Sequence, residues 1–357
     1  MVDLKKYGLS ERFEQEAKMH EGLFLARVVE QHRDLYKVIC VSGETNASVS
    51  GKFAYNTNDQ TNFPAVGDWV MIDRTNSSSG NAIIHNVLYR KSMLARQSAG
   101  ATSAGQVIAA NIDTIFICMS LNDDFNLRRV ERYLTLAWDS MATPVIVLTK
   151  SDLCVDIEQK LSEVRAVGVG VDILICSSVS DDGYEAVSAY IKPGKTIAFI
   201  GSSGVGKSTL INRLIGYEVM ATKTIRQDDD KGRHTTTHRQ LILLPSDCIV
   251  IDTPGMRELQ IHGGNMSKTF EDIEEIAARC KFRNCSHENE QGCAIKEAFG
   301  NGTLTEKRFE SYQKLQREVT YHGLNSRQIE NEKINQYFGG MNGKNQIKQF
   351  KRSLKKR

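Results

Sequence analysis

The chain has 357 residues, of which 40% are hydrophobic, 25% charged and 7% aromatic, and this composition excludes disordered and collagen-like proteins. Domains usually contain about 100–200 residues, so the length predicts two or three of them. The net charge of +3 is too small to indicate a class of partner.

The chain begins with a charged leader that we predict to be helical. The leader lacks the apolar segment of a secretion signal, and no apolar run elsewhere approaches the roughly 20 residues of a membrane helix. Eight cysteines are too few for a disulfide scaffold in a chain of this length. We therefore expect a cytoplasmic protein that does not bind membranes.

Short strands follow the leader. Five runs rich in β-branched or aromatic residues are separated by polar turns, which predicts five strands. They cover residues 23–31, 35–41, 46–53, 67–73 and 81–88. Five short strands within about seventy residues predict a small closed barrel of the oligonucleotide-binding (OB) type, with a plain β-sandwich as the alternative.

A second pattern begins near Gln106, where apolar strands alternate with helical segments. The strands are apolar on both faces, which is typical of a parallel sheet covered by helices. Cysteines inside them are interpreted as small buried hydrophobes. We predict strands at 113–120, 144–150, 171–178 and 194–201, helices at 127–141, 157–168 and 207–216, a hairpin-like pair at 239–245 and 247–255, and buried Cys118, Cys176 and Cys248.

A phosphate-binding loop lies between the strand at 194–201 and the helix that follows it. Its sequence, GSSGVGKS, fits the pattern GxxxxGK[ST], whose glycines let backbone N–H groups curl around a triphosphate. Lys207 would reach the β- and γ-phosphates, and the Ser208 hydroxyl would ligate Mg²⁺. The alternative is a glycine-rich turn without a ligand. The predicted phosphate site comprises Gly201, Ser202, Ser203, Gly204, Val205, Gly206, Lys207, Ser208 and Thr209.

Two later segments predict how Mg²⁺ and the γ-phosphate are held. Asp252 ends an apolar strand and opens the sequence DTPG, so its carboxylate is expected in the Mg²⁺ shell and the amide of Gly255 near the γ-phosphate. The loop GRHTTT, residues 232–237, offers Thr236 as a further Mg²⁺ ligand. For this loop the alternative is a threonine-rich surface turn.

Guanine is expected to be read upstream of the phosphate loop, by TKSD at the end of a predicted strand. The Asp152 carboxylate would accept from two guanine N–H groups, while the Lys150 stem covers the ring. In isolation such a sequence is often a solvated turn, but ligands of open α/β sheets bind at the carboxyl ends of strands. The predicted base site comprises Thr149, Lys150, Ser151, Asp152 and the base-closing residues Ser177 and Ser178.

The order of these motifs is that of a circularly permuted GTPase. The base-reading loop precedes the phosphate loop, and the two γ-phosphate-sensing segments follow it. Permutation preserves the contacts of the sheet and moves the chain ends. The segment after Gly255 leads into the C-terminal part, so loss of the γ-phosphate is expected to act on that part. A kinase or ATPase would share only the phosphate loop.

A cluster of cysteine and histidine follows, within fourteen residues. Three thiolates and one imidazole form the ligand set of a closed structural zinc site. We predict one Zn²⁺ per chain, with scattered free cysteines as the alternative. The predicted ligands are Cys280, Cys285, His287 and Cys293.

These motifs together resemble the bacterial ribosome small-subunit-dependent GTPase A family along nearly the whole chain. The resemblance implies an N-terminal OB barrel, a permuted P-loop α/β GTPase core and a mostly helical zinc-binding domain. It also implies a late role in maturation of the small ribosomal subunit, with hydrolysis stimulated by that subunit. Thr149 stands where many GTPases have Asn, which we expect to weaken a tie to the phosphate loop. The motifs are TKSD, GSSGVGKS, GRHTTT, DTPG and the Cys-Cys-His-Cys cluster, with AANID at 109–113 and FNLRRVERYL at 125–134.

The catalytic water needs a positioning group. In many GTPases a Gln directly after the DxxG glycine orients it, but Met256 occupies that place here. We predict that His234 takes this role beside the catalytic cation Lys207. The alternative is that His234 shapes its loop or contacts RNA.

We expect three domains, at residues 1–100, 101–262 and 263–357. The protein is expected to be a monomer that binds GTP or GDP together with Mg²⁺. Its expected partner is the small ribosomal subunit, on whose ribosomal RNA it would dock. The last fourteen residues, Lys344 to Arg357, hold seven Lys or Arg and no acid, so they would add to RNA affinity; a solvated tail without a role is the alternative.

A non-catalytic, nucleotide-switched RNA-binding module is the alternative function. A permuted GTPase of tRNA modification or membrane traffic is a third possibility, for which the sequence offers no substrate cysteine motif or lipid anchor.

Overall fold

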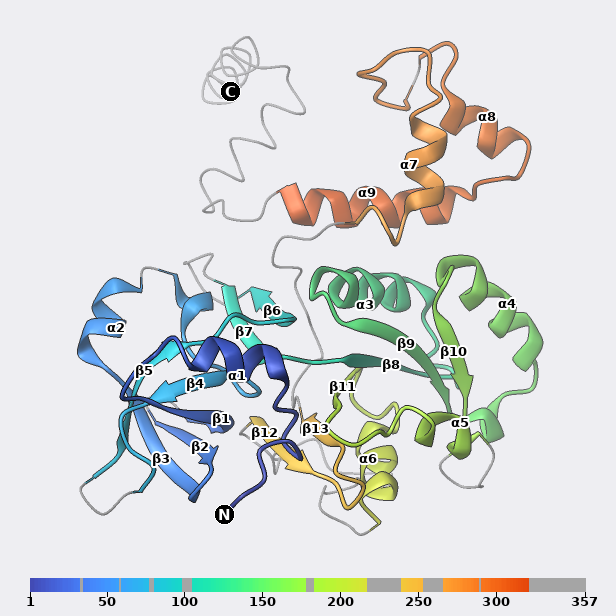
Figure 1. Ribbon diagram of the computed structural model, residues 1–357. Helices are drawn as coiled ribbons and strands as arrows, with labels where there is room; N and C mark the ends of the chain where they lie inside the picture. The colour runs from blue at the N-terminus through green and yellow to red at the C-terminus, as the bar shows by residue number, and fades with distance from the viewer. Residues whose placement is uncertain are drawn as a thin grey trace, which may run out of the picture.

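The computed structural model describes residues 1–32, 35–57, 59–76, 80–97, 105–177, 183–216, 239–252, 266–288 and 290–320 (Figure 1). In this part of the chain no helix is both long and apolar enough to span a bilayer.

A closed five-stranded barrel forms the N-terminal part. The strands are hydrogen-bonded in the order β1-β2-β3-β5-β4, and β4 returns to β1, which closes the barrel and makes the sandwich alternative wrong. The parallel pairing of β3 with β5 among otherwise antiparallel neighbours completes the barrel. Helix α1 (Glu11–Ala17) packs Phe13 against Trp69, with ring centroids 5.7 Å apart. The strands are β1 (Phe24–Gln31), β2 (Tyr36–Cys40), β3 (Gly43–Val49), β4 (Trp69–Ile72) and β5 (Ala82–Val87).

The predicted strand at 46–53 is half wrong. Its second half is helix α2 (Gly51–Asn56), and a 3₁₀ turn, η1 (Gln60–Asn62), follows. The reason is Ser50, whose extended backbone places its Oγ to accept a hydrogen bond from the Phe53 N–H at 3.0 Å. A serine that satisfies a free N–H group starts a helix wherever the next residues can follow.

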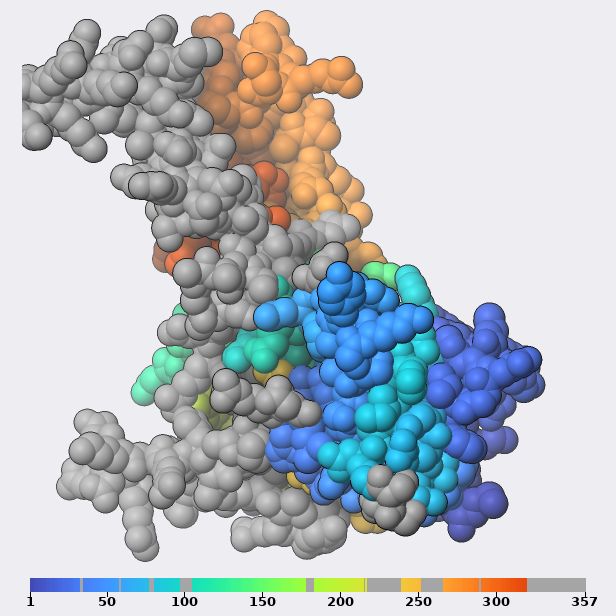
Figure 2. All heavy atoms as spheres, turned by 90° about the vertical axis from the view of Figure 1, so that its left-hand side faces the viewer, coloured from blue at the N-terminus to red at the C-terminus, as the bar shows by residue number. Residues whose placement is uncertain are grey.

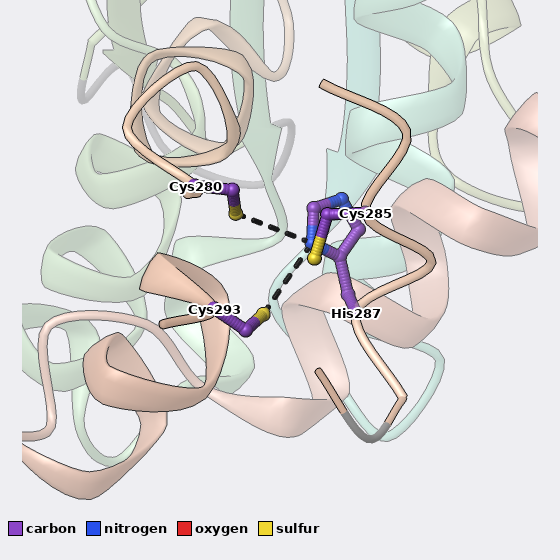
Figure 3. Close-up of side chains that lie close together, drawn as sticks. All are labelled: Cys280, Cys285, His287 and Cys293. Carbon is purple, nitrogen blue, oxygen red and sulfur yellow. Dashed lines mark hydrogen bonds between the residues drawn. The ribbon is translucent and has the colours of Figure 1, made fainter. Parts of the chain in front are cut away.

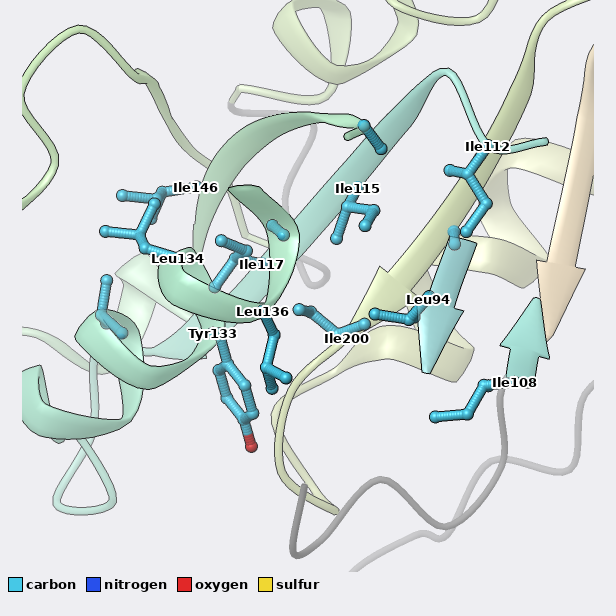
Figure 4. Packing of buried hydrophobic residues seen from close by; sticks show 14 of the residues in the cluster. Leu94, Ile108, Ile112, Ile115, Ile117, Tyr133, Leu134, Leu136, Ile146 and Ile200 are labelled. Atoms are coloured by element: carbon cyan, nitrogen blue, oxygen red, sulfur yellow. The ribbon is translucent and has the colours of Figure 1, made fainter. Parts of the chain in front are cut away.

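The central part is an α/β domain whose sheet runs β10-β9-β8-β11-β13 with parallel neighbours. Alternate residues of each strand face opposite layers. Ile115 and Ile117 pack under α3 (Figure 4), whereas Phe116 lies in the other core with Leu210 and Ile211 of α6. This two-sided burial explains the continuous apolar runs in the sequence. The strands are β8 (Thr114–Ser120), β9 (Thr143–Thr149), β10 (Asp172–Ile175), β11 (Thr196–Ile200) and β13 (Ile249–Asp252), and the helices are α3 (Leu127–Asp139), α4 (Ile157–Val167), α5 (Tyr184–Ser188) and α6 (Lys207–Ile215), with a 3₁₀ turn η2 (Ser151–Leu153) after β9.

One sheet connects the barrel with this domain, which the sequence did not indicate. Strand β12 (Arg239–Leu243) pairs with β13 on one side and with β1 of the barrel on the other, through Glu30 opposite Gln240. A hairpin of β6 (Met93–Gln97) and β7 (Gly105–Ala110) lies between the two parts and was also missed. The resulting sheet of eleven strands runs without a break in hydrogen bonding from the barrel into the central domain.

A buried arginine reinforces this junction. Arg27 of β1 is 1% exposed, and its guanidinium donates to the Gly67 carbonyl in the barrel at 3.1 Å and to the Thr196 hydroxyl of β11 at 3.0 Å. A third hydrogen bond reaches the Tyr7 carbonyl of the leader. The leader, the barrel and the central sheet are therefore all hydrogen-bonded to the Arg27 side chain.

The described C-terminal helices are α7 (Glu271–Ala277), α8 (Ala294–Gly300) and α9 (Glu306–Thr320), and α9 lies over α3 (Figure 1). The contact is built around Glu131 of α3, which is fully buried and accepts from Arg308 at 2.7 Å and from the Ser311 hydroxyl at 2.6 Å. Arg132 of α3 forms a bidentate ion pair with Glu318 of α9. Figure 2 shows these orange helices above the blue barrel. Both predicted domain borders fall outside the described residues, so they stay predictions.

Candidate nucleotide site and metal centre

The glycines of the predicted phosphate loop have the backbone that the loop requires. Gly201 follows β11 with φ 145°, and a Cβ there would lie 2.4 Å from the carbonyl oxygen of Cys118. Gly206 has φ 95° and precedes α6 directly, so the positive end of that helix faces the loop. Glycine is thus needed on steric grounds at both ends of the motif.

Lys207 lies inside this loop. Its Nζ donates to the carbonyl oxygens of Gly201 and Ser202, each at 2.6 Å. A β- or γ-phosphate oxygen in the loop could accept from the same ammonium group. Ser208 and Thr209 occupy the following positions at the start of α6, where a hydroxyl can reach a phosphate-bound cation.

Thr149, at the end of β9, joins the predicted base site to the phosphate loop. Its buried hydroxyl donates to the Val205 carbonyl at 2.5 Å and also lies 3.4 Å from the Met119 carbonyl. Thr149 therefore ties the base-reading strand to the phosphate loop, and the expectation that this tie is weaker than that of an Asn stays a prediction. A hydroxyl has a single proton, and the shorter distance assigns it to Val205.

The two predicted base loops also meet. The Ser177 hydroxyl donates to Asp152 Oδ1 at 2.6 Å, which fixes the orientation of the carboxylate. Lys150 has a left-handed backbone, φ 56° and ψ 41°, that turns the chain between β9 and Asp152. Asp152 itself is exposed, so its second oxygen can receive hydrogen bonds from a ligand.

Further residues line the small pocket behind these loops, and no motif indicated them. Arg213 of α6 lies over the Tyr184 ring, 4.4 Å from its centroid, and Nη1 reaches the Ser177 carbonyl at 3.5 Å. The Tyr184 hydroxyl donates to the Arg213 carbonyl at 3.1 Å. This contact fastens the base-closing loop to the helix that follows the phosphate loop. The pocket is lined by Thr149, Cys176, Ser177, Tyr184, Gly206, Leu210 and Arg213.

The sequence also gave no sign of a contact between α3 and the phosphate loop. Arg129 of α3 donates to the Ser202 hydroxyl at 3.3 Å and pairs with Asp124 at 2.9 Å. Helix α3 therefore contacts the phosphate loop near its first turn, where Asn126 caps it, and the C-terminal helices further along.

Asp252 is the last residue of β13, as predicted for the end of an apolar strand. Ser178, His234, Thr236 and Gly255 lie outside the described residues, as do Met256 and the basic tail.

The buried cysteines of the central domain behave as the sequence predicts. Burial raises the pKa of Cys118 to about 12, and the pKa values of Cys176 and Cys248 to about 11. A thiol with so high a pKa stays protonated at neutral pH and is a poor nucleophile.

The four predicted metal ligands converge near α8 (Figure 3). His287 Nδ1 lies 3.6 Å from the Cys280 sulfur and 3.5 Å from the Cys293 sulfur, and all four ligand atoms lie within 4.8 Å of one another. Tetrahedral Zn²⁺ with bonds of about 2.3 Å to sulfur and about 2.0 Å to nitrogen separates these atoms by about 3.5 Å. Burial lowers the pKa of His287, which favours the neutral, ligating imidazole. The cluster therefore fits a structural zinc ion.

Comparison with known proteins places these features in a family. The family model described as RsgA GTPase matches residues 87–262, and one described as 50S ribosome-binding GTPase matches residues 196–336. The chain is 53% identical over 348 residues to "Small ribosomal subunit biogenesis GTPase RsgA 2" of Lactiplantibacillus plantarum, covering 98% of both chains. The chain belongs to the RsgA GTPase family. "Small ribosomal subunit biogenesis GTPase RsgA 1" of Listeria innocua is 46% identical, over 89% of this chain and 90% of that protein.

Solved structures agree with this membership and with the permutation. The structure of this chain is similar to the crystal structure of YjeQ from Thermotoga maritima. The sequences are 27% identical, and the TM-score is 0.60 over 84% of this chain and 99% of that chain. It is also similar to YloQ, described as a circularly permuted GTPase, with 25% identity and a TM-score of 0.58 over 84% of this chain and 96% of that chain. The resemblance drawn from the motifs, the permuted GTPase fold and GTP hydrolysis as the reaction class are confirmed.

Proposed function

We propose that this protein hydrolyses GTP as a late assembly factor of the small ribosomal subunit and that the subunit stimulates its turnover. The observation that carries the proposal is that the predicted loops meet: Thr149 bonds the base-reading strand to the phosphate loop at Val205, and Ser177 bonds the base-closing loop to Asp152. The names of the relatives supply the biological setting. A non-catalytic RNA-binding switch is not favoured by membership in a GTPase family.

The residues divide the chemistry between base and phosphates. Asp152 accepts from guanine, with Ser177 holding its carboxylate in place. Lys207 neutralises charge on the β- and γ-phosphates, and Ser208 is the Mg²⁺ ligand that the phosphate-loop pattern supplies. Thr236 and Asp252 are proposed to complete the Mg²⁺ shell, because their sequence motifs follow the phosphate loop in the order this chemistry needs.

Zinc has a structural role in this proposal. Four protein ligands, Cys280, Cys285, His287 and Cys293, leave no position open for a reacting water. The ion would hold the segment before α8 against α9, where His287 packs edge-on against Phe309 at 5.8 Å. One ion per chain is expected.

RNA contact is assigned to the barrel, the zinc-binding part and the basic tail. Closed barrels of this type commonly bind oligonucleotides, and seven positive charges in the tail favour phosphate contacts. The protein is expected to act as a cytoplasmic monomer.

Multiple-turnover GTP hydrolysis tests the proposal, measured with purified small subunits, with large subunits and with neither. Small subunits alone should raise the turnover number. Lys207→Ala is the control, because it removes a phosphate contact without touching the barrel. Equal rates in all three conditions would reject stimulation by the small subunit.

A further inference from the structure

Two arginines flank strand β7 at the junction of barrel and central domain. Arg239, the first residue of β12, donates to the Val107 carbonyl at 3.0 Å. Arg96 of β6 donates through Nε and Nη2 to the neighbouring Gln106 side chain at 3.3 and 3.2 Å. Two guanidinium groups are thus fixed at consecutive residues of one strand.

This pair lacks a counter-charge among the residues that the structure describes. Arg90 and Arg308, which are also largely buried, each face carboxylates at 2.7 Å. Arg239 has a backbone carbonyl as its hydrogen-bond partner and the positive charge of Arg96 nearby. Burial, together with that charge, lowers the pKa of Arg239 to about 10. Two like charges in a partly buried place cost free energy unless an anion joins them.

The location links the barrel to the nucleotide site. Arg239 pairs with Gln31 of the barrel strand β1, and the next residue, Gln240, lies opposite Asp252 in the ladder between β12 and β13. Arg239 also follows the segment GRHTTTH directly in the sequence. Figure 2 shows small patches in the yellow of residues 239–252 beside the blue barrel. An anion held by Arg239 would therefore lie on β12, the strand between β1 of the barrel and β13, which ends at Asp252.

We propose that Arg96 and Arg239 form a binding site for a backbone phosphate of RNA, placed so that docking on RNA is felt at the nucleotide site. The planar guanidinium group suits this ligand, because its N–H donors match two phosphate oxygens at once. The contact carries no sequence information and fixes the position of the protein on the RNA. This inference rests on the proposed function, since it presumes RNA as the docking partner.

The test uses the full-length double variant R96Q/R239Q and purified small subunits in the presence of a non-hydrolysable GTP analogue. At low salt its affinity should fall at least tenfold, and the slope of log affinity against log salt should decrease by about 1 to 2. The variant R165Q/K192Q removes the same charge from exposed positions of the central domain and should leave the slope unchanged. R96K/R239K keeps the charges and should retain most of the slope.

Two further measurements, of nucleotide affinity and of thermal unfolding, distinguish an RNA phosphate from two other anions that could neutralise Arg96 and Arg239. If the pair binds the γ-phosphate of the nucleotide, R96Q/R239Q loses affinity for GTP relative to GDP without subunits, and the proposal is wrong. If carboxylates of the chain itself neutralise the pair, such as those of the acidic run 228–230, the double variant unfolds at lower temperature and its salt slope matches the wild type. We expect unchanged GTP affinity and an unchanged or higher unfolding temperature, because two repelling charges are removed. Basal GTP turnover should be normal.

The outcomes also separate this inference from the proposed function. A wild-type protein that fails to bind small subunits would overturn both. Normal wild-type binding with the same salt slope in R96Q/R239Q would overturn the phosphate site alone. Inorganic phosphate at millimolar concentration should not compete, because a single ion lacks the remaining contacts of the RNA backbone.

Discussion

We propose that selectivity for guanine depends on a single carboxylate. Asp152 is oriented by Ser177 at 2.6 Å, and its charge suits the two N–H donors on the Watson–Crick edge of guanine. Asp152→Asn replaces one acceptor by a donor, so GTP should be lost and xanthosine triphosphate gained, because unpaired polar groups in a closed site cost on the order of several kcal/mol. Equilibrium binding of GTP, xanthosine triphosphate and ATP measures this change. Equal wild-type affinity for ATP and GTP would reject the assignment.

The hydroxyl of Thr149 is the second residue-scale feature with a measurable effect. Thr149→Val keeps the shape but removes the proton that the Val205 carbonyl accepts at 2.5 Å. Leaving this acceptor unsatisfied should cost about 1–3 kcal/mol of unfolding free energy and weaken GTP binding. Thr149→Ser keeps the hydroxyl and is the matched control. Denaturant unfolding and GTP titration of both variants check the expectation; a valine variant as stable as the serine variant contradicts it.

Helix α3 connects the phosphate loop with the C-terminal helices, because Arg129 reaches Ser202 while Glu131 and Arg132 pair with α9. The sequence predicted the helix from its apolar spacing but gave no sign of this double role, since ion-pair partners nearly 180 residues apart leave no local pattern. The same holds for the pairing of β12 with β1. Local signals such as glycines and apolar runs predict elements, whereas long-range partners depend on the completed fold.

Glu131→Gln tests the α3 contact. Neutralising this fully buried carboxylate leaves Arg308, 11% exposed at its side chain, without one of its partners, so the docked C-terminal helices should lose about 3 kcal/mol of stability. Limited proteolysis between residues 252 and 266 and denaturant unfolding measure the effect. Glu158→Gln, at an exposed position of α4, is the matched control and should behave as wild type. Equal protease resistance of the two variants would contradict the role of Glu131.

Removal of zinc should destabilise the segment that carries the four ligands and leave nucleotide binding by the GTPase core nearly unchanged. Chelation removes the ion and Cys285→Ser removes one of its four ligands, so the segment before α8 should lose its anchor on α9. GTP affinity should stay within about twofold, because α9 meets the core through α3 and not through the base site. Metal analysis, protease sensitivity and GTP titration provide the three readings. Protein purified without chelator that contains no zinc would reject the metal assignment.

At the scale of the whole molecule, the barrel and the GTPase core share one sheet, so a displacement of barrel strand β1 would act directly on β12, which is paired with both β1 and β13. The sequence predicted both parts separately, because the change from short strands to two-sided apolar strands marks where one pattern ends. It failed at 46–53, where a capping serine outweighs an alternating pattern, and at the β6–β7 hairpin. At the base and phosphate loops the residues that the sequence named lie together in the fold, and their roles toward the nucleotide stay predictions.

This shared sheet suggests how docking could control hydrolysis. Met256 follows the DxxG glycine and cannot orient water as a Gln would, so the free protein should bind GTP well and cleave it slowly. His234 lies five residues before Arg239, the start of the strand that joins barrel and core. An imidazole brought to the γ-phosphate when the barrel meets the small subunit would position the water only at the correct site.

His234→Ala should therefore separate binding from turnover. Affinity for GTP and for the subunit should stay near normal, because neither the base loop nor the barrel changes. Subunit-stimulated turnover should fall at least tenfold, about 1.4 kcal/mol of barrier, while the slow basal rate changes little. His238→Ala, nearer the strand, is the matched control and should keep stimulation. Intact stimulation in His234→Ala would place the water-positioning group elsewhere, including on the ribosome itself, and loss of stimulation in both variants would point to a general effect on the segment.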